Sequence, residues 1–227
     1  MLKNTLLNIL YPKLCIVCKK PSSYLCPNCQ KYLKLIKIQK CPYCQKPSPS
    51  GYTHPQCLNK TPLSGSYSIF YYQGPTKSLI KKAKYSSSFD LLPYLVSLSK
   101  PYLPSFFYHF DLLIPIPLHK DRKKLRGFNQ SQIIASSFSK ITSIPTKPIL
   151  LKNRATLPQA QLKTKSQRIN NLKNVFSLNP KSNYDIKNKK LLLIDDITTT
   201  STTLTQAAKS LKQKNPQSIW ALTLARG

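Results

Sequence analysis

Two adjacent carboxylates, Asp195 and Asp196, directly follow an apolar run, and a string of hydroxyl residues comes shortly after them. The run at 191–194 reads LLLI, and residues 198–203 read TTTSTT. Carboxylates accept hydrogen bonds from sugar hydroxyls or approach Mg²⁺ held by a diphosphate. Hydroxyls and backbone N–H groups at a helix start can hold a phosphate. A ligand that combines a ribose with phosphates would use both halves; an acidic turn that only caps a helix is the alternative.

A basic segment follows a second apolar run and is the other candidate site. Residues 119–126 read HKDRKKLR, and Gly127 then allows a tight backbone before a helix that we expect to run to about residue 140. We interpret 119–126 as a loop dense in hydrogen-bond donors, which is a natural anion site between a strand and a helix start. Candidate ligands of a diphosphate or of DNA in this loop are His119, Lys120, Arg122 and Arg126.

The elements around both segments alternate between strand and helix patterns from residue 111 onward. Strands are expected at 112–116, at 190–194 and in the final SIWALTLARG, and a helix is expected over about 203–214. Such alternation predicts an α/β fold with a parallel sheet. Ligands of open α/β sheets bind at the carboxyl ends of the strands, and the acidic pair lies at such an end.

Two further stretches bear on the fold. Residues 66–72 predict a strand, Gly74-Pro75 predicts a turn, and the residues after it predict two helices. Residues 150–178 are largely polar and poor in apolar periodicity until Val175 and Phe176. We expect them to form a long loop that is either a functional lid or disordered.

The seven cysteines lie between residues 15 and 57 in pairs with two residues between the members, and a histidine completes the fourth pair. Two such pairs can complete a tetrahedron around Zn²⁺; buried or redox-active cysteines are the alternative. With four protein ligands and no open position, each zinc site would be structural. Grouping neighbouring pairs gives the following sites, and an interleaved grouping stays open: Cys15, Cys18, Cys26 and Cys29; Cys41, Cys44, His54 and Cys57.

The chain is strongly basic, with 36 Lys and Arg against six acidic residues and a formal net charge of +30. Drift of the composition toward Lys, Asn and Ile is one explanation, and a polyanionic partner is the other. Lys and Tyr are interleaved through the cysteine segment, as in folds that stack bases and pair phosphates. Packing in a small domain would also explain single tyrosines. These features together suggest single-stranded DNA as a partner.

The length of 227 residues allows one α/β domain and a small appendage. We expect the zinc-binding appendage at 1–60 and the α/β domain at 61–227. Asn4, Asn8 and Pro12 interrupt the apolar residues at the start of the sequence. Neither an export signal nor a transmembrane segment is therefore expected.

Several motifs resemble known families. The stretch LLLIDDITTTSTTL resembles the ribose-phosphate loop of type I phosphoribosyltransferases. More narrowly, DLLIPIPLHKDRKKLRGFNQSQIIA and RATLPQAQLKTKSQRINNLKNVF resemble the ComF family of competence-associated proteins. The cysteine segment followed by YYQGPTKSLIKKAKY is similar to the same family, including its N-terminal double zinc ribbon. The resemblance covers essentially the whole chain.

The resemblance implies a type I phosphoribosyltransferase-like parallel sheet behind a double zinc ribbon. It implies that Asp195 and Asp196 hold ribose hydroxyls, and that the basic segment grips a diphosphate together with Mg²⁺. One departure is Ser201, where the family usually has Gly; if this position needs a positive φ, Ser costs roughly 1–2 kcal/mol of local strain. The residues implied around the 5′-phosphate are Thr199, Thr200, Ser201, Thr202 and Thr203.

Two functions of different classes follow from the resemblance. The first is a role in DNA uptake during natural competence, in a protein that binds ribose phosphate and single-stranded DNA, with a competence helicase as partner. The second is a Mg²⁺-dependent phosphoribosyltransferase that uses phosphoribosyl diphosphate on an unknown acceptor. We favour the first because no acceptor base pocket can be read from the sequence, and catalysis stays open. Either protein would be cytoplasmic or peripheral at the inner membrane.

Overall fold

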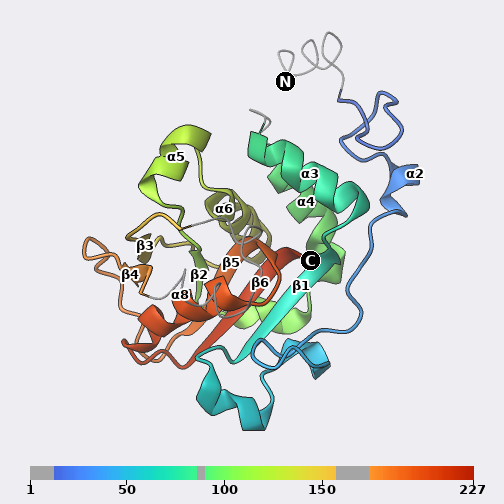
Figure 1. Cartoon of the computed structure of the whole chain (residues 1–227). Coiled ribbons are helices and arrows are strands. Elements are labelled where there is room, and N and C mark those ends of the chain that lie inside the picture. Colours follow the sequence, from blue (N-terminus) through green and yellow to red (C-terminus); the bar gives the residue numbers. More distant parts are fainter. Residues whose placement is uncertain (1–12, 86–89, 157–173) are drawn as a thin grey trace.

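A computed structural model describes residues 13–85, 90–156 and 174–227 of the chain. Its largest sheet has four strands, and a separate hairpin has two (Figure 1). The strands are β1 (Gly65–Tyr71), β2 (Leu112–Pro115), β3 (Leu150–Lys152), β4 (Phe176–Leu178), β5 (Lys190–Thr198) and β6 (Ser218–Arg226). The longer helices are α3 (Gly74–Tyr85), α4 (Leu91–Ser99), α5 (Lys120–Arg126), α6 (Gln130–Thr142) and α8 (Thr202–Lys212).

The four-stranded sheet is parallel throughout, in the order β1-β6-β5-β2. Its central strands are almost continuously apolar, as expected for strands that are covered on both faces. Because all four strands run the same way, their carboxyl ends share one edge of the sheet. The parallel α/β fold predicted from the alternation of elements is confirmed.

Helices cover both faces of this sheet (Figure 1). On one face, α3, α4 and α6 pack over a core that contains Phe107, Phe138 and Trp220. On the other face, α8 and the β3–β4 hairpin enclose a second core, which includes Leu191, Leu193 and apolar residues of α8. Helices that alternate with parallel strands reach both faces through right-handed crossovers.

Two local expectations are wrong, and one expected strand is present but longer than predicted. Residues 119–126 contain helix α5 rather than a loop, because His119 caps its start and Gly127 ends it in the left-handed conformation (φ 79°). The strand expected at 190–194 continues to Thr198, since β6 keeps pairing with it beyond the acidic pair. Gly74-Pro75 opens α3 instead of forming a turn, as proline is well tolerated in the first turn of a helix.

The region expected to be one long loop, 150–178, is only partly described. Its first three residues form β3 and its last three form β4, and these strands pair antiparallel. Residues 157–173, which hold the Pro-Gln and Arg-x-Asn elements of the family resemblance, lie outside the described residues. The expected lid therefore stays a prediction.

The cysteine segment packs against the rest of the chain along its course (Figure 1). Leu35 forms an antiparallel bridge with Phe70 of β1, and Tyr52 forms another with Gly65. These bridges cover the free edge of β1, which would otherwise expose unpaired backbone groups. The division into domains at residue 60 stays a prediction, but residues 34–60 contribute to the edge of the sheet. Within the described ranges, no helix combines the length and apolar character needed to cross a membrane.

Candidate functional site

A cavity of about 410 Å³ lies at the carboxyl edge of the sheet. Residues that follow β1, β2 and β5 line it, together with residues of the β3 region. It thus lies where ligands of open α/β sheets bind. Its polar lining consists of Tyr72, Lys84, Arg122, Arg126, Gln130, Ser131, Lys152, Thr156, Asp195, Asp196, Thr198, Thr199, Thr200, Ser201, Thr202 and Thr203.

The two carboxylates of the acidic pair lie in different environments. Ser131 of α6 donates a hydrogen bond from its Oγ to Asp195 Oδ1 at 2.8 Å. Lys84 of α3 forms an ion pair with Asp196, with Nζ 2.5 Å from Oδ2. Burial, together with the neighbouring charge of Asp196, raises the pKa of Asp195 to about 7. The pair therefore offers one carboxylate fixed by a cation and one that titrates near neutral pH.

The hydroxyl-rich turn after β5 is shaped for close approach of a ligand. Ser201 caps the start of α8 with φ 57° and ψ 9°, so the positive φ considered for this position is present. Its backbone N–H donates to Thr198 Oγ1 at 3.1 Å. Ser201 is 2% exposed, and its Oγ has no hydrogen-bond partner in the described structure. A buried hydroxyl without a partner at a helix start suits an anion that binds there.

The basic segment contributes two of its four candidate residues to the cavity. Arg122 and Arg126 line it, and they lie one helical turn apart on α5. His119 is 7% exposed and caps the start of α5, where its Nδ1 accepts a hydrogen bond from the backbone N–H of Asp121 at 3.4 Å. Lys120 is exposed, and neither it nor His119 lines the cavity.

Seven polar lining residues are not among the candidates that the sequence indicates: Tyr72, Lys84, Gln130, Ser131, Lys152, Thr156 and Thr198. Lys152 of β3 donates from Nζ to Thr156 Oγ1 at 2.8 Å. Burial and the nearby charge of Arg122 lower the pKa of Lys152 to about 8. Lys84 and Ser131 come from helices after other strands. Their only sequence signal is that each lies within about 15 residues after an expected strand, Lys84 after 66–72 and Ser131 after 112–116.

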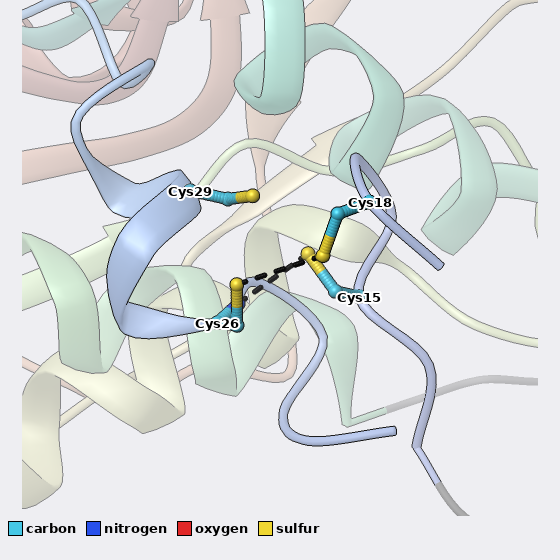
Figure 2. Close-up of side chains that lie close together, drawn as sticks. All are labelled: Cys15, Cys18, Cys26 and Cys29. Carbon is cyan, nitrogen blue, oxygen red and sulfur yellow. Dashed lines mark hydrogen bonds between the residues drawn. The ribbon is translucent and has the colours of Figure 1, made fainter. Parts of the chain in front are cut away.

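The first cysteine group is assembled as the grouping of neighbouring pairs predicts (Figure 2). All four sulfur atoms lie within 4.8 Å of one another and face a common space. Cys18 Sγ lies 3.7 Å from Cys26 Sγ, close to the ~3.8 Å that tetrahedral Zn–S bonds of ~2.3 Å require. The group packs on α4: Cys15, Leu25 and Cys29 form a buried cluster against Tyr94 and Leu98.

The second group joins three cysteines and His54, also within 4.8 Å. His54 Nδ1 lies 3.3 Å from Cys44 Sγ, and its Nε2 lies 3.0 Å from the carbonyl of Pro47. A zinc-binding imidazole usually donates its other N–H to such an acceptor, so the ring is oriented as a ligand. The interleaved grouping left open by the sequence does not occur. Both donor sets fit structural zinc, which would cross-link the segment.

Comparisons with known proteins agree with these features. The model of the double zinc ribbon domain matches residues 6–58. Competence protein F of Haemophilus influenzae is 29% identical over 89% of this chain and 90% of its own length. Competence protein ComFC of Bacillus subtilis is 27% identical over 91% of this chain and 86% of its own length. DNA utilization protein YhgH of Escherichia coli K12 is 25% identical over 95% and 97%.

Among solved structures, purine phosphoribosyltransferase from Pyrococcus horikoshii matches 59% of this chain and 81% of its own, with a TM-score of 0.37 and 15% identity. A glutamine phosphoribosylpyrophosphate amidotransferase from Bacillus subtilis matches 63% of this chain and 30% of its own, with a TM-score of 0.38 and 15% identity. The sequence matches to the competence proteins extend over both the sheet and the cysteine-containing residues 13–60, which we call the zinc segment. Over nearly its whole length the chain is thus similar to the competence proteins F and ComFC, and it carries a double zinc ribbon at its N-terminal end.

Proposed function

We propose that the cavity binds phosphoribosyl diphosphate, and that the protein uses this site in the uptake of DNA during natural competence. One observation carries the proposal: a carboxylate pair and an unsatisfied phosphate-type turn line the same cavity as Arg122, Arg126 and Lys152. A ribose that carries a phosphate at one end and a diphosphate at the other needs acceptors, a helix start and cations in this arrangement.

Each part of the site would then have its own task. The carboxylates of Asp195 and Asp196 accept hydrogen bonds from the ribose hydroxyls. The turn from Thr199 to Thr203 surrounds the 5′-phosphate, where Ser201 Oγ gains the partner it lacks. The arginines of α5 pair with the diphosphate, for which their planar guanidinium groups suit bidentate contacts.

Magnesium fits the same donor set. Carboxylate oxygens and phosphate oxygens are the ligands that Mg²⁺ prefers, and Asp195 and Asp196 supply carboxylates at the cavity. When bound, the ion would neutralise charge on the diphosphate. The protein would contribute positioning and a fixed array of charges.

The competence role rests on the relatives, which are named competence proteins and a DNA utilization protein. This chain matches each of them over most of its length. The partners we propose are single-stranded DNA and a competence helicase. The alternative is a phosphoribosyltransferase with an unknown acceptor. Release of diphosphate from phosphoribosyl diphosphate with Mg²⁺ and candidate acceptors would favour this alternative.

Calorimetric titration with phosphoribosyl diphosphate and Mg²⁺ tests the site. Asp196→Asn removes a charged acceptor and should weaken binding by roughly 1–3 kcal/mol. Asp185→Asn is the matched control, because Asp185 is exposed and, among the described residues, its carboxylate accepts a hydrogen bond only from the backbone of Lys187. Equal affinities of the wild type and Asp196→Asn would exclude the acidic pair as the ribose site.

The zinc segment carries a specific arrangement that favours single-stranded DNA. Tyr32 is 49% exposed, and Lys31 Nζ lies 5.4 Å from its ring centroid. Tyr43 is 38% exposed, and Lys60 Nζ lies 5.7 Å from its ring. A ring that is open to solvent beside a cation can stack a base while the cation pairs with a phosphate.

Single tyrosine variants test this surface without removing charge or the cover of β1. Tyr32→Ala and Tyr43→Ala should each lower affinity for a single-stranded oligonucleotide by about 1–3 kcal/mol if a base stacks there. Tyr108→Ala is the control, since Tyr108 is 39% exposed on η4 (Ser105–His109), outside the zinc segment. Affinity should also fall steeply with salt. If Tyr32→Ala and Tyr43→Ala bind the oligonucleotide as tightly as Tyr108→Ala and the wild type, no base stacks on this segment.

A further inference from the structure

Buried polar atoms without partners gather at one edge of the sheet. Five residues hold such atoms in the described structure: Ser66, Thr76, Gln130, Ser201 and Arg226. Ser66 lies near the start of β1. The other four lie after, or at the end of, a strand at the carboxyl edge. Such groups are rare in native proteins, and each calls for an explanation.

Arg226 is the most costly of these groups. It is 4% exposed, and its Nε and both Nη atoms have no hydrogen-bond partner among the described residues. A guanidinium stays protonated in proteins, so a positive charge is buried there without a hydrogen bond or ion pair among the described residues. Burial of an unpaired charge opposes folding, and a residue with this cost is expected to serve a ligand.

The chain's own acids do not compensate this charge. All six are aspartates within the described ranges, and none forms an ion pair with Arg226 there. Each has another partner: Asp90 with Lys13, Asp111 with the Lys190 backbone, Asp121 with His119, Asp185 with the Lys187 backbone, Asp195 with Ser131, and Asp196 with Lys84. Among the described residues no aspartate is paired with Arg226, so its counter-charge is one that a ligand can supply.

The position of Arg226 is beside the cavity. It pairs in register with Tyr71 of β1 and Thr198 of β5. Its carbonyl accepts a hydrogen bond from the backbone N–H of Tyr72 at 2.7 Å. Both Tyr72 and Thr198 line the cavity, and Tyr71 is 44% exposed. The backbone of Arg226 is therefore adjacent to two residues that line the cavity.

We propose that Arg226 forms a second anion subsite, which takes the carboxylate or phosphate of a small acceptor molecule beside the ribose-phosphate site. This inference rests on the proposed function, because it names the class of the second ligand of that site. A small molecule fits better than a DNA backbone, since a side chain exposed by only 4% offers no open groove to a polymer. A planar guanidinium binds either oxyanion with two parallel hydrogen bonds.

The test compares the wild type with Arg226→Met and with Lys212→Met, which removes the same charge from an exposed position of α8. Each protein is saturated with ribose 5-phosphate and then titrated with inorganic phosphate or benzoate. We expect the wild type and Lys212→Met to bind at least one of these anions, and Arg226→Met to bind it roughly tenfold more weakly or not at all. All three should bind ribose 5-phosphate equally.

The melting temperature separates a ligand role from a structural one. An unpaired buried charge replaced by an apolar side chain of similar length should leave the melting temperature of Arg226→Met unchanged or raise it. A clear fall that Arg226→Lys reverses would show that the charge supports the fold, and would overturn the proposal.

Four other outcomes are decisive. Equal anion binding by wild type and Arg226→Met, or no anion binding by the wild type, overturns the subsite. Weaker binding of an oligonucleotide by Arg226→Met, with small anions unaffected, assigns the charge to DNA and also overturns it. If the wild type does not bind ribose 5-phosphate, the proposed function fails. Phosphate titration of wild type and Arg226→Met without the sugar then still decides the subsite.

Discussion

Two buried glutamines show how differently the zinc segment and the carboxyl edge are built. Gln39 of the zinc segment is 4% exposed, and Gln130 at the cavity is 2% exposed. Gln39 Nε2 donates to the carbonyl of Ser68, and its Oε1 accepts from the Ser68 backbone N–H, at 2.9 and 3.0 Å. Gln130 Oε1 accepts from Arg126 at 2.9 Å, whereas its Nε2 has no partner in the described structure.

The difference teaches where this molecule gains stability and where it gives stability up. The buried side-chain amide of Gln39 has both its donor and its acceptor bonded to Ser68, and it links the zinc segment to β1. A half-bonded amide faces a cavity, where a ligand can complete it. Unsatisfied groups gather at functional sites because the surrounding fold holds them in place.

Removal of zinc should have the largest effect and would test the first half of this comparison. Structural zinc contributes about 10–16 kcal/mol of binding free energy in small domains. Chelation should loosen the sheet as well as the zinc segment, because Tyr52 packs edge-on against Trp220 with ring centroids 4.6 Å apart. Trp220 is the only tryptophan, so its fluorescence reports this directly. Unchanged emission after complete chelation would show that the sheet stands alone.

Substitution of the two glutamines should give the next largest change in the free energy of unfolding. Gln39→Ala leaves the Ser68 backbone groups buried and unpaired, and should lower the free energy of unfolding by about 2–4 kcal/mol. Gln130→Ala removes an amide that is already half unpaired, and should cost less than about 1 kcal/mol. Urea unfolding of both variants gives the comparison. Equal losses would contradict the contrast drawn between the two regions.

The sequence predicted the parts of the site that are contiguous and missed those assembled by the fold. An apolar strand, two aspartates and a hydroxyl-rich turn lie within one short stretch, and regular cysteine pairs report zinc by spacing alone. Lys84 and Lys152 lie far from this stretch and reach the cavity only through the crossover of β1 and the β3–β4 hairpin. The sequence predicts a loop where α5 lies, because residues 119–126 are mostly basic and show no helical spacing of apolar residues.

Proton binding at Asp195 sharpens the second half of the comparison. The pKa of about 7 means that its carboxyl group is largely protonated at pH 6 and largely ionised at pH 8. Ribose hydroxyls donate to the ionised form, so affinity for ribose 5-phosphate should rise about tenfold over this range. Because the folded pKa lies above the ordinary value, stability of the free protein should instead fall as pH rises from about 4 to 7.

Titration calorimetry at several pH values checks this, with Asp195→Asn as the reference. Ionisation of the ligand's own phosphate affects both proteins, so it cancels in the ratio of their affinities. Lys152, whose pKa is lowered to about 8, lies near Asp195, and Asp196 beside it is paired with Lys84. A wild-type-to-variant ratio that does not change with pH would show that Asp195 does not contact the sugar.

Substitution of Ser201 should have the smallest effect and separates stability from binding at one residue. Gly accepts the left-handed backbone of this position without strain and removes a buried hydroxyl that lacks a partner. Against this, Gly loses more backbone entropy on folding. Ser201→Gly should therefore raise the free energy of unfolding by a net ~1 kcal/mol.

The same change should weaken ribose 5-phosphate binding by about 0.5–1.5 kcal/mol, because the phosphate loses one hydrogen-bond donor. Thermal unfolding and calorimetry on one protein preparation measure both quantities. Opposite signs for stability and affinity are what an unsatisfied group kept for a ligand requires. If Ser201→Gly were less stable than the wild type, or bound the phosphate more tightly, Ser201 Oγ would not be a phosphate donor, and the turn would bind through its backbone alone.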